Sequence, residues 1–408
     1  MSDISVRPSR AVIDWHKAGW RTYLACIALS FFVMLEPAPT DLVFCIALGM
    51  MLLAPIQPVK LFGPFVTLGL ILFLWFSVLS LFFVTDLFFA AYRAIVIEIY
   101  ISLLFVLTAY FVKVSGDKAF RLILVMLFLG GLLTSLIGVL AYLDLIPQRQ
   151  LFFRDDYLKR IRSTFKDPNV LGPYLVPSIL AGIWIVLTSP KLRWMVGFAT
   201  VLMIAALVIT YSRGAWAHFI VSLSVFGCFM LVNRQTYFAA FVALIAVGCG
   251  GMLAAVYYSD ALGAALGDSY FSRRLSFQSY DTKRFDLILR ALFDMTGTPL
   301  GIGPYQSRVF YGWEPHNSFA LLGLQNGLFA LLGYVLICVG AIWRCATKVL
   351  AQEDGWFKYA FILSVLIGLM VVSQVVSSLH WRHLYVVLGL AFGDYKTNQF
   401  FEGRRIFS

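Results

Sequence analysis

Charged side chains are scarce in this chain. Of its 408 residues only 13% are Asp, Glu, Lys or Arg, whereas 61% are hydrophobic. Apolar runs of about 17 to 25 residues recur along the sequence, each long enough to cross a bilayer as a helix. These runs are continuously apolar rather than alternating, which excludes a membrane β-barrel. The composition therefore excludes a soluble globular protein and predicts an all-α, polytopic membrane protein.

Cysteine is also rare, and the sequence shows neither an internal repeat nor a separate soluble domain. The chain has six cysteines and no Cys-x-x-Cys motif. All of them fall in or beside apolar runs, which predicts buried, unpaired thiols. Residues 1–408 are expected to form a single integral membrane domain.

Hydropathy predicts about twelve transmembrane helices. Their centres are expected near Ala28, Leu48, Phe73, Ile97, Phe128, Ile179, Ala205, Val225, Ala246, Val335, Ile367 and Leu388. The N-terminal segment carries Arg7, Arg10 and Lys17 without a cleavable signal pattern, so the positive-inside rule places it in the cytoplasm. An even number of spans then returns the C-terminus to the same side.

Basic residues are abundant in two segments that this topology places outside the cytoplasm, where the positive-inside rule disfavours them. The two predicted outward segments, residues 144–169 and 259–315, contain six Lys or Arg residues each, in a chain of net charge +11. Residues that only attract anionic lipid are expected on the cytoplasmic side. An outward excess instead predicts an anionic ligand outside the cytoplasm.

The outward segment 259–315 is too long to be a simple turn, and we expect it to carry short helices. Its stretch DTKRFDLILRALFDM has Phe285, Ile288, Leu289 and Leu292 at helical spacing, with Lys and Arg on other faces. This pattern predicts an amphipathic helix at the outer membrane surface.

The motif RSTFKDPNVLGPYL begins at Arg162 and leads into an apolar run. Asp167 suits a helix N-cap and Pro168 the first helical turn, with Asn169 beside them. That structural interpretation does not account for Arg162 and Lys166, which are candidate ligands for an anion.

In the motif TYSRGAW, Arg213 lies between two apolar runs with almost no connection. The arginine either snorkels from a helix end or holds a guanidinium at the membrane surface, where it can bind phosphate through two hydrogen bonds. The sequence leaves both interpretations open. Further on, Gly301 and Gly303 in PLGIGP lack the following Lys-Ser or Lys-Thr of a nucleotide loop, and they predict a tight turn.

The stretch EPHNSFALLGLQNG places His316 and Asn317 directly before an apolar helical run. A lone histidine there usually caps or solvates the helix end. The positive end of the helix dipole, however, favours a nearby anion and a neutral imidazole, which can accept a proton. Beside a phosphate and a hydroxyl, such a histidine is suited to general-base catalysis. Glu314 is an alternative base.

Two further pairs of polar residues lie in or near the predicted spans. Arg93 and Glu98 share one span, and because a charge costs about 2.5–3.5 kcal/mol at the bilayer centre, both should face protein or water. We expect Arg93 to join the outward cationic site and Glu98 to pair with another helix. His380 and His383 have no third metal ligand of Cys, His, Asp or Glu type in their turn. We therefore interpret them as interfacial aromatic residues and not as a metal site.

In their order and spacing these motifs resemble the O-antigen ligase and polymerase family of polytopic membrane glycosyltransferases. The resemblance covers the chain from about Arg162 to its end. The family's ligase pattern of His, then Asn, Ser or Gln, nine residues and Gly is met by His316, Asn317 and Gly327. Ala330 departs from the Gly, Thr or Tyr that some ligases carry at that position.

The resemblance implies a bacterial inner-membrane enzyme with both termini cytoplasmic and an active site facing the periplasm. It implies transfer of a glycan from undecaprenyl diphosphate to a sugar hydroxyl of a glycan or lipid A core acceptor, with inversion and without a metal or cofactor. The catalytic residues would be Arg213, Arg284 and His316. Residues expected to bind diphosphate or glycan are Arg93, Arg162, Lys166, Asn169, Arg290 and Asn317. Membrane lipids and other polysaccharide-assembly proteins are expected partners, and nucleic acid is not.

Elementary chemistry agrees with such a reaction. No nucleotide-sugar pool exists outside the cytoplasm, so a donor must carry its own leaving group, and arginines can stabilise the charge that develops on a departing diphosphate. Two alternatives stay open. A polymerase of O-antigen or exopolysaccharide units would use the same donor with another acceptor. A transporter of polysaccharide or lipid-linked glycan would place charges and broken helices at the bilayer midplane, often in repeated halves.

Overall fold

The computed structural model describes residues 14–55, 57–147, 149–154, 160–232 and 279–396. Within these ranges every regular element is a helix, and one isolated β-bridge joins Phe153 to Ile161. The predicted all-helical fold is therefore confirmed for the described part of the chain. The predicted span centre Ala246 and residues 259–278 of the long outward segment lie outside the described residues.

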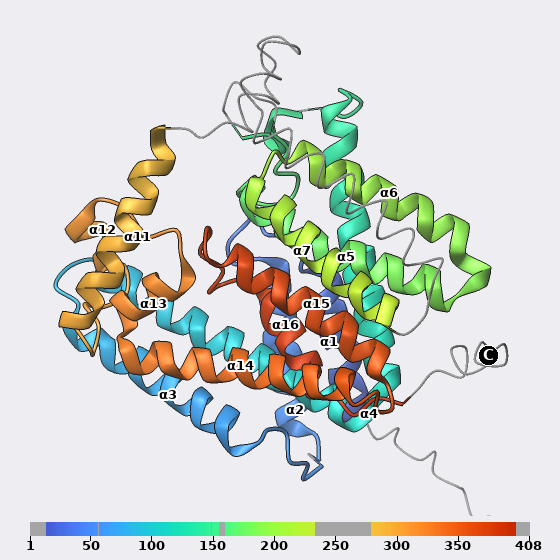
Figure 1. Ribbon diagram of the computed structural model, residues 1–408, viewed down its shortest axis with the longest axis horizontal. Helices are drawn as coiled ribbons and strands as arrows, with labels where there is room; N and C mark the ends of the chain where they lie inside the picture. The colour runs from blue at the N-terminus through green and yellow to red at the C-terminus, as the bar shows by residue number, and fades with distance from the viewer. Residues whose placement is uncertain (1–13, 56, 148, 155–159, 233–278, 397–408) are drawn as a thin grey trace, which may run out of the picture.

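The helices carry the labels of Figure 1. In chain order they are α1 (Trp15–Leu29), α2 (Pro39–Leu53), α3 (Pro64–Ser80), η1 (Leu81–Phe83), α4 (Phe88–Tyr142), η2 (Arg149–Phe152), α5 (Pro168–Thr188), η3 (Pro190–Leu192), α6 (Arg193–Ile209), α7 (Arg213–Val232), α11 (Ser279–Gly297), α12 (Gln306–Tyr311), α13 (Ser318–Asn326), α14 (Leu328–Leu350), α15 (Trp356–Val372) and α16 (Arg382–Leu390).

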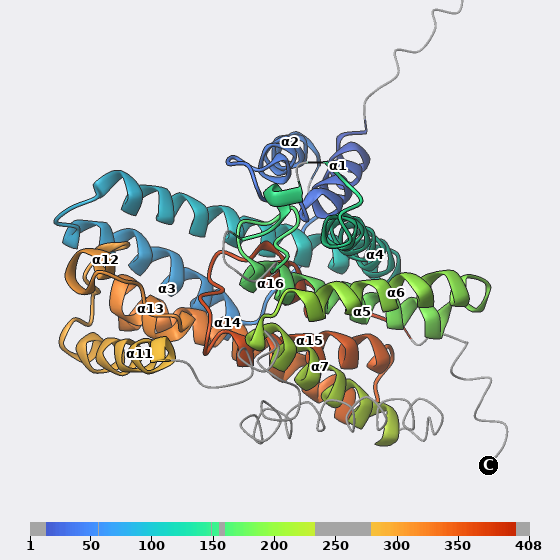
Figure 2. The same cartoon turned by 90° about the horizontal axis from the view of Figure 1, so that it is seen from above.

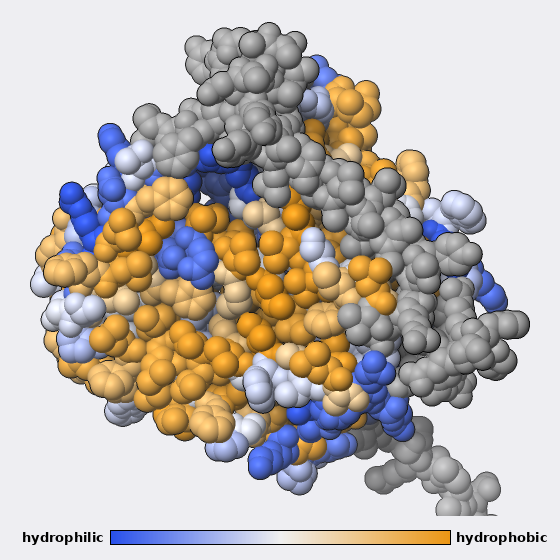
Figure 3. Space-filling model, in the orientation of Figure 1, coloured by the Kyte–Doolittle hydropathy of each residue, from blue (hydrophilic) through white to orange (hydrophobic). Residues whose placement is uncertain are grey.

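Six of the described helical segments are long and apolar enough to cross a membrane, namely α3 with η1, α4, α5, η3 with α6, α7 and α14. Large apolar side chains stand exposed on several of them, including Trp75 on α3, Trp194 on α6 and Trp343 on α14. Figure 3 shows a broad apolar area on one face, with hydrophilic residues gathered at two opposite edges. Apolar surface of this extent is not stable against water, so these helices indicate a membrane protein.

Helix α4 holds two of the predicted span centres, Ile97 and Phe128. Gly116, with φ 50° and ψ −124°, interrupts the helical geometry inside this 55-residue element. Glycine tolerates that conformation because it has no Cβ. The two legs of α4 diverge at this point (Figure 1).

The last predicted span, around Leu388, falls in α16. This helix has nine residues, which at 1.5 Å per residue extend for only about 14 Å, less than the thickness of a bilayer core. Its residues from His383 to Leu390 are buried, and it packs against α4. The apolar stretch is therefore enclosed by other helices. The Lys396 carbonyl accepts from Lys358 at 2.6 Å, so after α16 the chain has returned to the start of α15.

The centre of the molecule is built around α5 and α15, most of whose side chains are buried. Helix α15 packs against α7 and α14, α5 against α6 and α4, and α3 against α14. A Cβ added at Gly333 of α14 would lie 2.5 Å from the carbonyl oxygen of Gly69 on α3, so glycine permits this close helix approach. Helices α11, α12 and α13 gather at one end, where α3 ends and α4 and α14 begin (Figure 2).

The prediction that all cysteines are buried is only partly right. Cys26, Cys338 and Cys345 are buried, whereas Cys45 and Cys228 are exposed, and these five thiols are free. A membrane helix turns one face outward, so an apolar context does not predict burial. Cys249 lies outside the described residues.

Candidate functional site

The connection between α15 and α16, residues 373–381, touches several segments that the sequence motifs single out. We call it the α15–α16 loop. The backbone N–H of Ser318 donates to the Ser373 carbonyl at 2.8 Å, and the Asn317 amide donates to the Gln374 carbonyl at 3.2 Å. The Arg284 guanidinium donates to the Val375 carbonyl, also at 3.2 Å. The loop thus supports both α11 and the start of α13.

Arg213 is the first residue of α7 and reaches the same region. Its guanidinium donates to both carboxylate oxygens of Asp281, at 2.7 and 2.8 Å. Asp281 lies on α11 one turn before Arg284. The start of α7 also lies against the α15–α16 loop, because a Cβ added at Gly214 would lie 3.4 Å from the Val375 side chain. The structure therefore brings Arg213 and Arg284 together beside one loop, and Arg213 faces a carboxylate rather than lipid.

His316 is half-buried in the connection from α12 to α13. Burial, followed by the positive charge of Arg284, lowers the pKa of its imidazole below the usual value, while Glu314 and Asp167 act in the opposite direction. This lowered pKa favours the neutral imidazole. Two of the charges that act on it belong to Arg284 of α11 and to Asp167 just before α5.

Asn317, which was predicted to bind diphosphate or glycan, has a structural role at the start of α13. Its side-chain oxygen accepts from the N–H groups of Phe319 and Ala320, both at 2.9 Å, and caps α13. Its amide nitrogen is engaged with Gln374, so the side chain positions the helix instead of pointing at a ligand.

The nine-residue spacing between Asn317 and Gly327 is the length of α13. Gly327 has a φ of 93°, and a Cβ there would lie 2.6 Å from the Pro299 carbonyl oxygen. The turn predicted at PLGIGP is confirmed, because Gly301 and Gly303 have φ values of 83° and 96°. The Gly303 N–H donates to the Gln325 carbonyl at 2.9 Å and fixes this turn against α13.

The start of α5 agrees with its helix-cap interpretation. The Asp167 carboxylate accepts from the Asn169 N–H at 2.7 Å, and Pro168 is the first helical residue. Asn169 accepts from the guanidinium of the buried Arg160, which also donates to the Thr210 carbonyl close to Arg213. Arg160 was missed because nothing in the sequence distinguishes it from the other basic residues of its segment.

Arg162 lies apart from this contact. Its Nε donates to the Leu151 carbonyl at 3.2 Å, and it thereby holds the 3-10 helix η2. Asn169 and Arg162 are thus both engaged with the protein, and neither is brought to the α15–α16 loop by a described contact.

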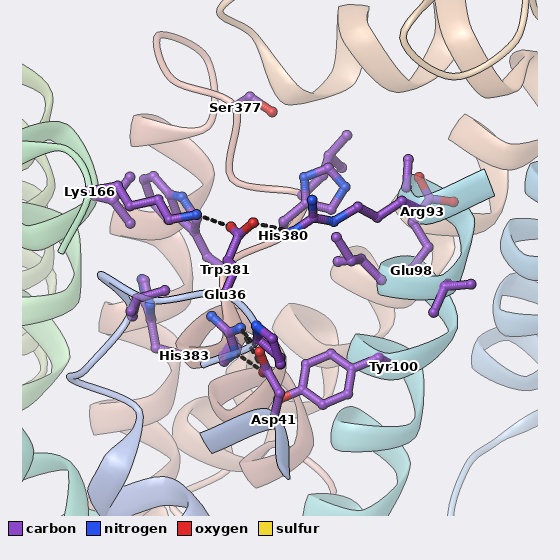
Figure 4. A pocket seen from close by; sticks show the side chains of 18 of the residues that line it. Glu36, Asp41, Arg93, Glu98, Tyr100, Lys166, Ser377, His380, Trp381 and His383 are labelled. Atoms are coloured by element: carbon purple, nitrogen blue, oxygen red, sulfur yellow. Dashed lines mark hydrogen bonds and ion pairs between the residues drawn. The ribbon is translucent and has the colours of Figure 1, made fainter. Parts of the chain in front are cut away.

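A cavity of about 980 Å³ opens beside the α15–α16 loop. It is lined by the α1–α2 connection, by α4 and by the starts of α5 and α12, and it includes Arg93, Lys166 and Glu314. The Glu36 carboxylate pairs with both Arg93 and Lys166, and Figure 4 shows Glu36 between them. Arg93 therefore shares a carboxylate with a second cation, and that this group faces outward stays a prediction. Glu314 accepts from Arg308 at 2.9 Å.

The cavity is also lined by an ion pair that sequence reasoning did not select. Arg382 of α16 makes three hydrogen bonds of 2.6–2.8 Å with Asp41 of α2. The predicted helix–helix partner of Glu98 is Asn326, whose amide donates to that carboxylate at 3.0 and 3.1 Å. The acidic turn EPAPTD, which supplies Glu36 and Asp41, was the available signal for the ion pairs at the cavity.

His380 and His383 line this cavity instead of facing lipid, which corrects their interpretation as interfacial aromatic residues. His383 stacks on Trp381 with ring centroids 5.3 Å apart. Both residues are inside because the α15–α16 loop turns inward and α16 is a buried helix. Among the described residues, no group of three or more His, Cys, Asp or Glu side chains could hold a metal ion.

Helix α11 is amphipathic, as its spacing predicts. Ile288 and Ala291 pack against Ala320 and Leu324 of α13, whereas Phe285, Leu289, Leu292 and Phe293 are exposed. Arg290 is exposed on another face than Arg284, and its charge acts on Tyr311.

Comparison with known proteins adds no family to this description. The sequence matches no protein-family model, and no curated protein matches it.

Proposed function

We propose that this protein is a membrane glycosyltransferase of the O-antigen ligase and polymerase type. It moves a glycan from undecaprenyl diphosphate to a sugar hydroxyl at the end of the molecule formed by α11, α12 and α13. The observation that carries the proposal is the convergence of Arg213, Arg284 and the His316–Asn317 segment beside the α15–α16 loop. Two guanidinium groups and a neutral imidazole form the set that a metal-independent transfer from a diphosphate requires.

Each group has a definite part in the reaction. The imidazole of His316 takes the proton of the acceptor hydroxyl, whose oxygen attacks the anomeric carbon as the bond to the diphosphate breaks, with inversion. Arg213 and Arg284 stabilise the negative charge of the departing lipid diphosphate. The lowered pKa of His316 supports this role, because the imidazole must be neutral to accept the proton.

The local contacts favour His316 over Glu314 as the base. The Glu314 carboxylate is held by Arg308, and the pKa of that guanidinium is raised by this hydrogen bond. A carboxylate paired with a cation is a weaker proton acceptor than an unpaired one.

The membrane arrangement follows from this chemistry. The proposal places about twelve spans in a bacterial inner membrane, both termini in the cytoplasm and the α11–α13 end in the periplasm, where lipid-linked donors are used. The exposed apolar face of α11 would then rest on the outer leaflet.

The test is a transfer assay with purified protein in vesicles. A lipid-linked glycan is supplied with either core lipid or a second lipid-linked unit, and the glycosidic product is measured. His316→Ala and Arg213→Ala should each lower the rate by a factor on the order of 10² or more. Arg344→Ala is the control, because Arg344 has a similarly exposed side chain, 29% against 31%, and pairs with Asp394 near the other end of α14.

The outcomes are separable. Product on the core lipid supports a ligase, and product on the second lipid-linked unit supports a polymerase. Movement of the glycan across the vesicle membrane without a new glycosidic bond would refute an enzyme and support the transporter. Near-normal product from either site variant would remove that residue from the mechanism.

A further inference from the structure

One carboxylate of the chain sits between two of its cations at the cavity. Glu36, in the connection between α1 and α2, pairs with Arg93 of α4 and with Lys166 just before α5 (Figure 4). All three residues line the cavity. Three segments that are distant in sequence thus meet at a small group of net charge +1.

This group is open to water. The side chains of Glu36, Arg93 and Lys166 are 42%, 59% and 49% exposed. Ion pairs between such exposed groups contribute little stability, so another anion can replace the carboxylate at low cost. The hydrogen bond from Lys166 in particular holds the pKa of Glu36 below its usual value, so the residue stays ionised and remains an internal competitor. The Asp41–Arg382 pair, by contrast, is largely buried and has three hydrogen bonds.

The cavity beyond Glu36 has features that suit a sugar. Tyr100, Tyr174 and Trp381 present aromatic side chains to it. The Nε2 atoms of His380 and His383 are buried, and neither has a hydrogen-bond partner within the described part of the chain. Buried polar atoms normally have partners, and sugar hydroxyls could supply them while the aromatic side chains cover the apolar face of the ring.

We propose that Arg93 and Lys166 form a second phosphate site, that Glu36 occupies it when no substrate is bound, and that its ligand is a phosphate-bearing saccharide. The inference rests on the proposed function, in which Arg213 and Arg284 hold the donor diphosphate. The second phosphate site then holds the acceptor. The acceptor is accordingly an anionic, phosphorylated glycan, and its binding displaces Glu36 from the two cations.

Binding of a soluble probe tests the phosphate site directly. Full-length protein in neutral detergent is titrated with a hexose 1-phosphate, and the heat of binding is measured. Glu36→Gln should tighten binding about fivefold, because it removes a competing ion pair. The triple variant with Arg93→Gln and Lys166→Gln added should lose that gain. Unchanged affinity in Glu36→Gln, or a gain that persists in the triple variant, would overturn the phosphate site.

The chain offers a matched control for the charge change. Asp394 also accepts from two cations, Lys113 at 2.6 Å and Arg344 at 2.8 Å, but it does not line the cavity. Asp394→Asn removes the same charge from the same kind of three-residue group. Equal tightening in this variant would show a general charge effect and overturn the site.

Two further arms identify the ligand. In nanodiscs, phosphatidylglycerol that displaces the hexose phosphate would assign the site to a lipid headgroup and overturn the saccharide, whereas neutral lipid should have no effect. Inorganic phosphate that binds as tightly as the hexose phosphate would also overturn the sugar contribution. The expected result is tighter binding of the hexose phosphate than of either.

The transfer assay separates this inference from the proposed function. In Glu36→Gln the KM for the acceptor should fall about fivefold, while the KM for the donor stays unchanged. Active transfer with an unchanged acceptor KM and unchanged probe binding would refute the second site alone. Probe binding as expected in a protein that forms no glycosidic bond would refute the proposed function alone.

Discussion

The replacement Arg213→Ala tests whether this arginine has a structural part as well as a catalytic one. Its partner Asp281 has a side chain only 6% exposed, so the variant leaves a buried carboxylate without its cation. Breaking a fully buried pair costs about 3–5 kcal/mol. Because the Arg213 side chain is 31% exposed and water already reaches it, we expect a smaller loss of about 2–3 kcal/mol in the free energy of unfolding.

A second substitution separates the two parts. Adding Asp281→Ala to Arg213→Ala removes the unpaired carboxylate, and the double variant should recover to within about 1 kcal/mol of the wild type. Transfer should stay lost, because the diphosphate still lacks its guanidinium. Arg213→Ala alone can therefore lower the amount of folded protein, and the double variant is the better test of chemistry.

The assay is the heat-denaturation midpoint of each purified variant, measured beside glycan transfer. Arg213→Ala should denature several degrees below the wild type, and the double variant should lie between them. Equal midpoints for Arg213→Ala and the wild type, or a double variant less stable than Arg213→Ala, would refute the structural part. Transfer restored in the double variant would remove Arg213 from the mechanism.

Four further predictions follow from single residues. Gly327→Ala forces a side chain into a φ of 93° against backbone atoms and should lower the denaturation midpoint by an amount equivalent to about 1–3 kcal/mol, whereas Gly197→Ala, with no atom within 4 Å, should not. Transfer should fall with decreasing pH as His316 becomes protonated, at a pKa below the usual histidine value. Glu314→Gln removes a carboxylate that raises this pKa, so the acid limb of the pH–rate profile should move to lower pH with transfer retained; loss of transfer would make Glu314 the base. Arg382→Gln leaves a largely buried carboxylate on α2 unpaired and should destabilise the protein by about 2–3 kcal/mol in the same denaturation assay; a wild-type midpoint would contradict it.

Local chemistry explains which parts of the fold were predictable. A helix cap and a tight turn each depend on a few adjacent residues. The structure confirms the cap at Asp167 and Pro168 and the turn at Gly301 and Gly303. The shortness and burial of α16 were not predicted, because apolar composition is the same for a long helix in lipid and a short helix inside the protein. Its surroundings, and not its sequence, decide between the two.

The candidate site was also predictable only in part. Arg213, Arg284 and His316 were selected by residue type and position, and the structure brings their segments to one loop. The carboxylate partners of Arg213 and Arg382 were not selected, because pairing joins distant positions. Asp281 lies 68 residues from Arg213, and Asp41 lies 341 residues from Arg382. No spacing rule in the sequence connects residues so far apart.

The α15–α16 loop holds its neighbours chiefly through main-chain oxygen atoms. The carbonyls of Ser373, Gln374 and Val375 accept from Ser318, Asn317 and Arg284 respectively. A carbonyl is present whatever the side chain, so replacing Ser373, Gln374 or Val375 would leave these three contacts available. The length of the loop, in contrast, cannot change without moving these carbonyls. Inserting one residue would shift the acceptors out of register and uncouple the histidine segment from the arginine helix, although every chemical group of the site would still be present.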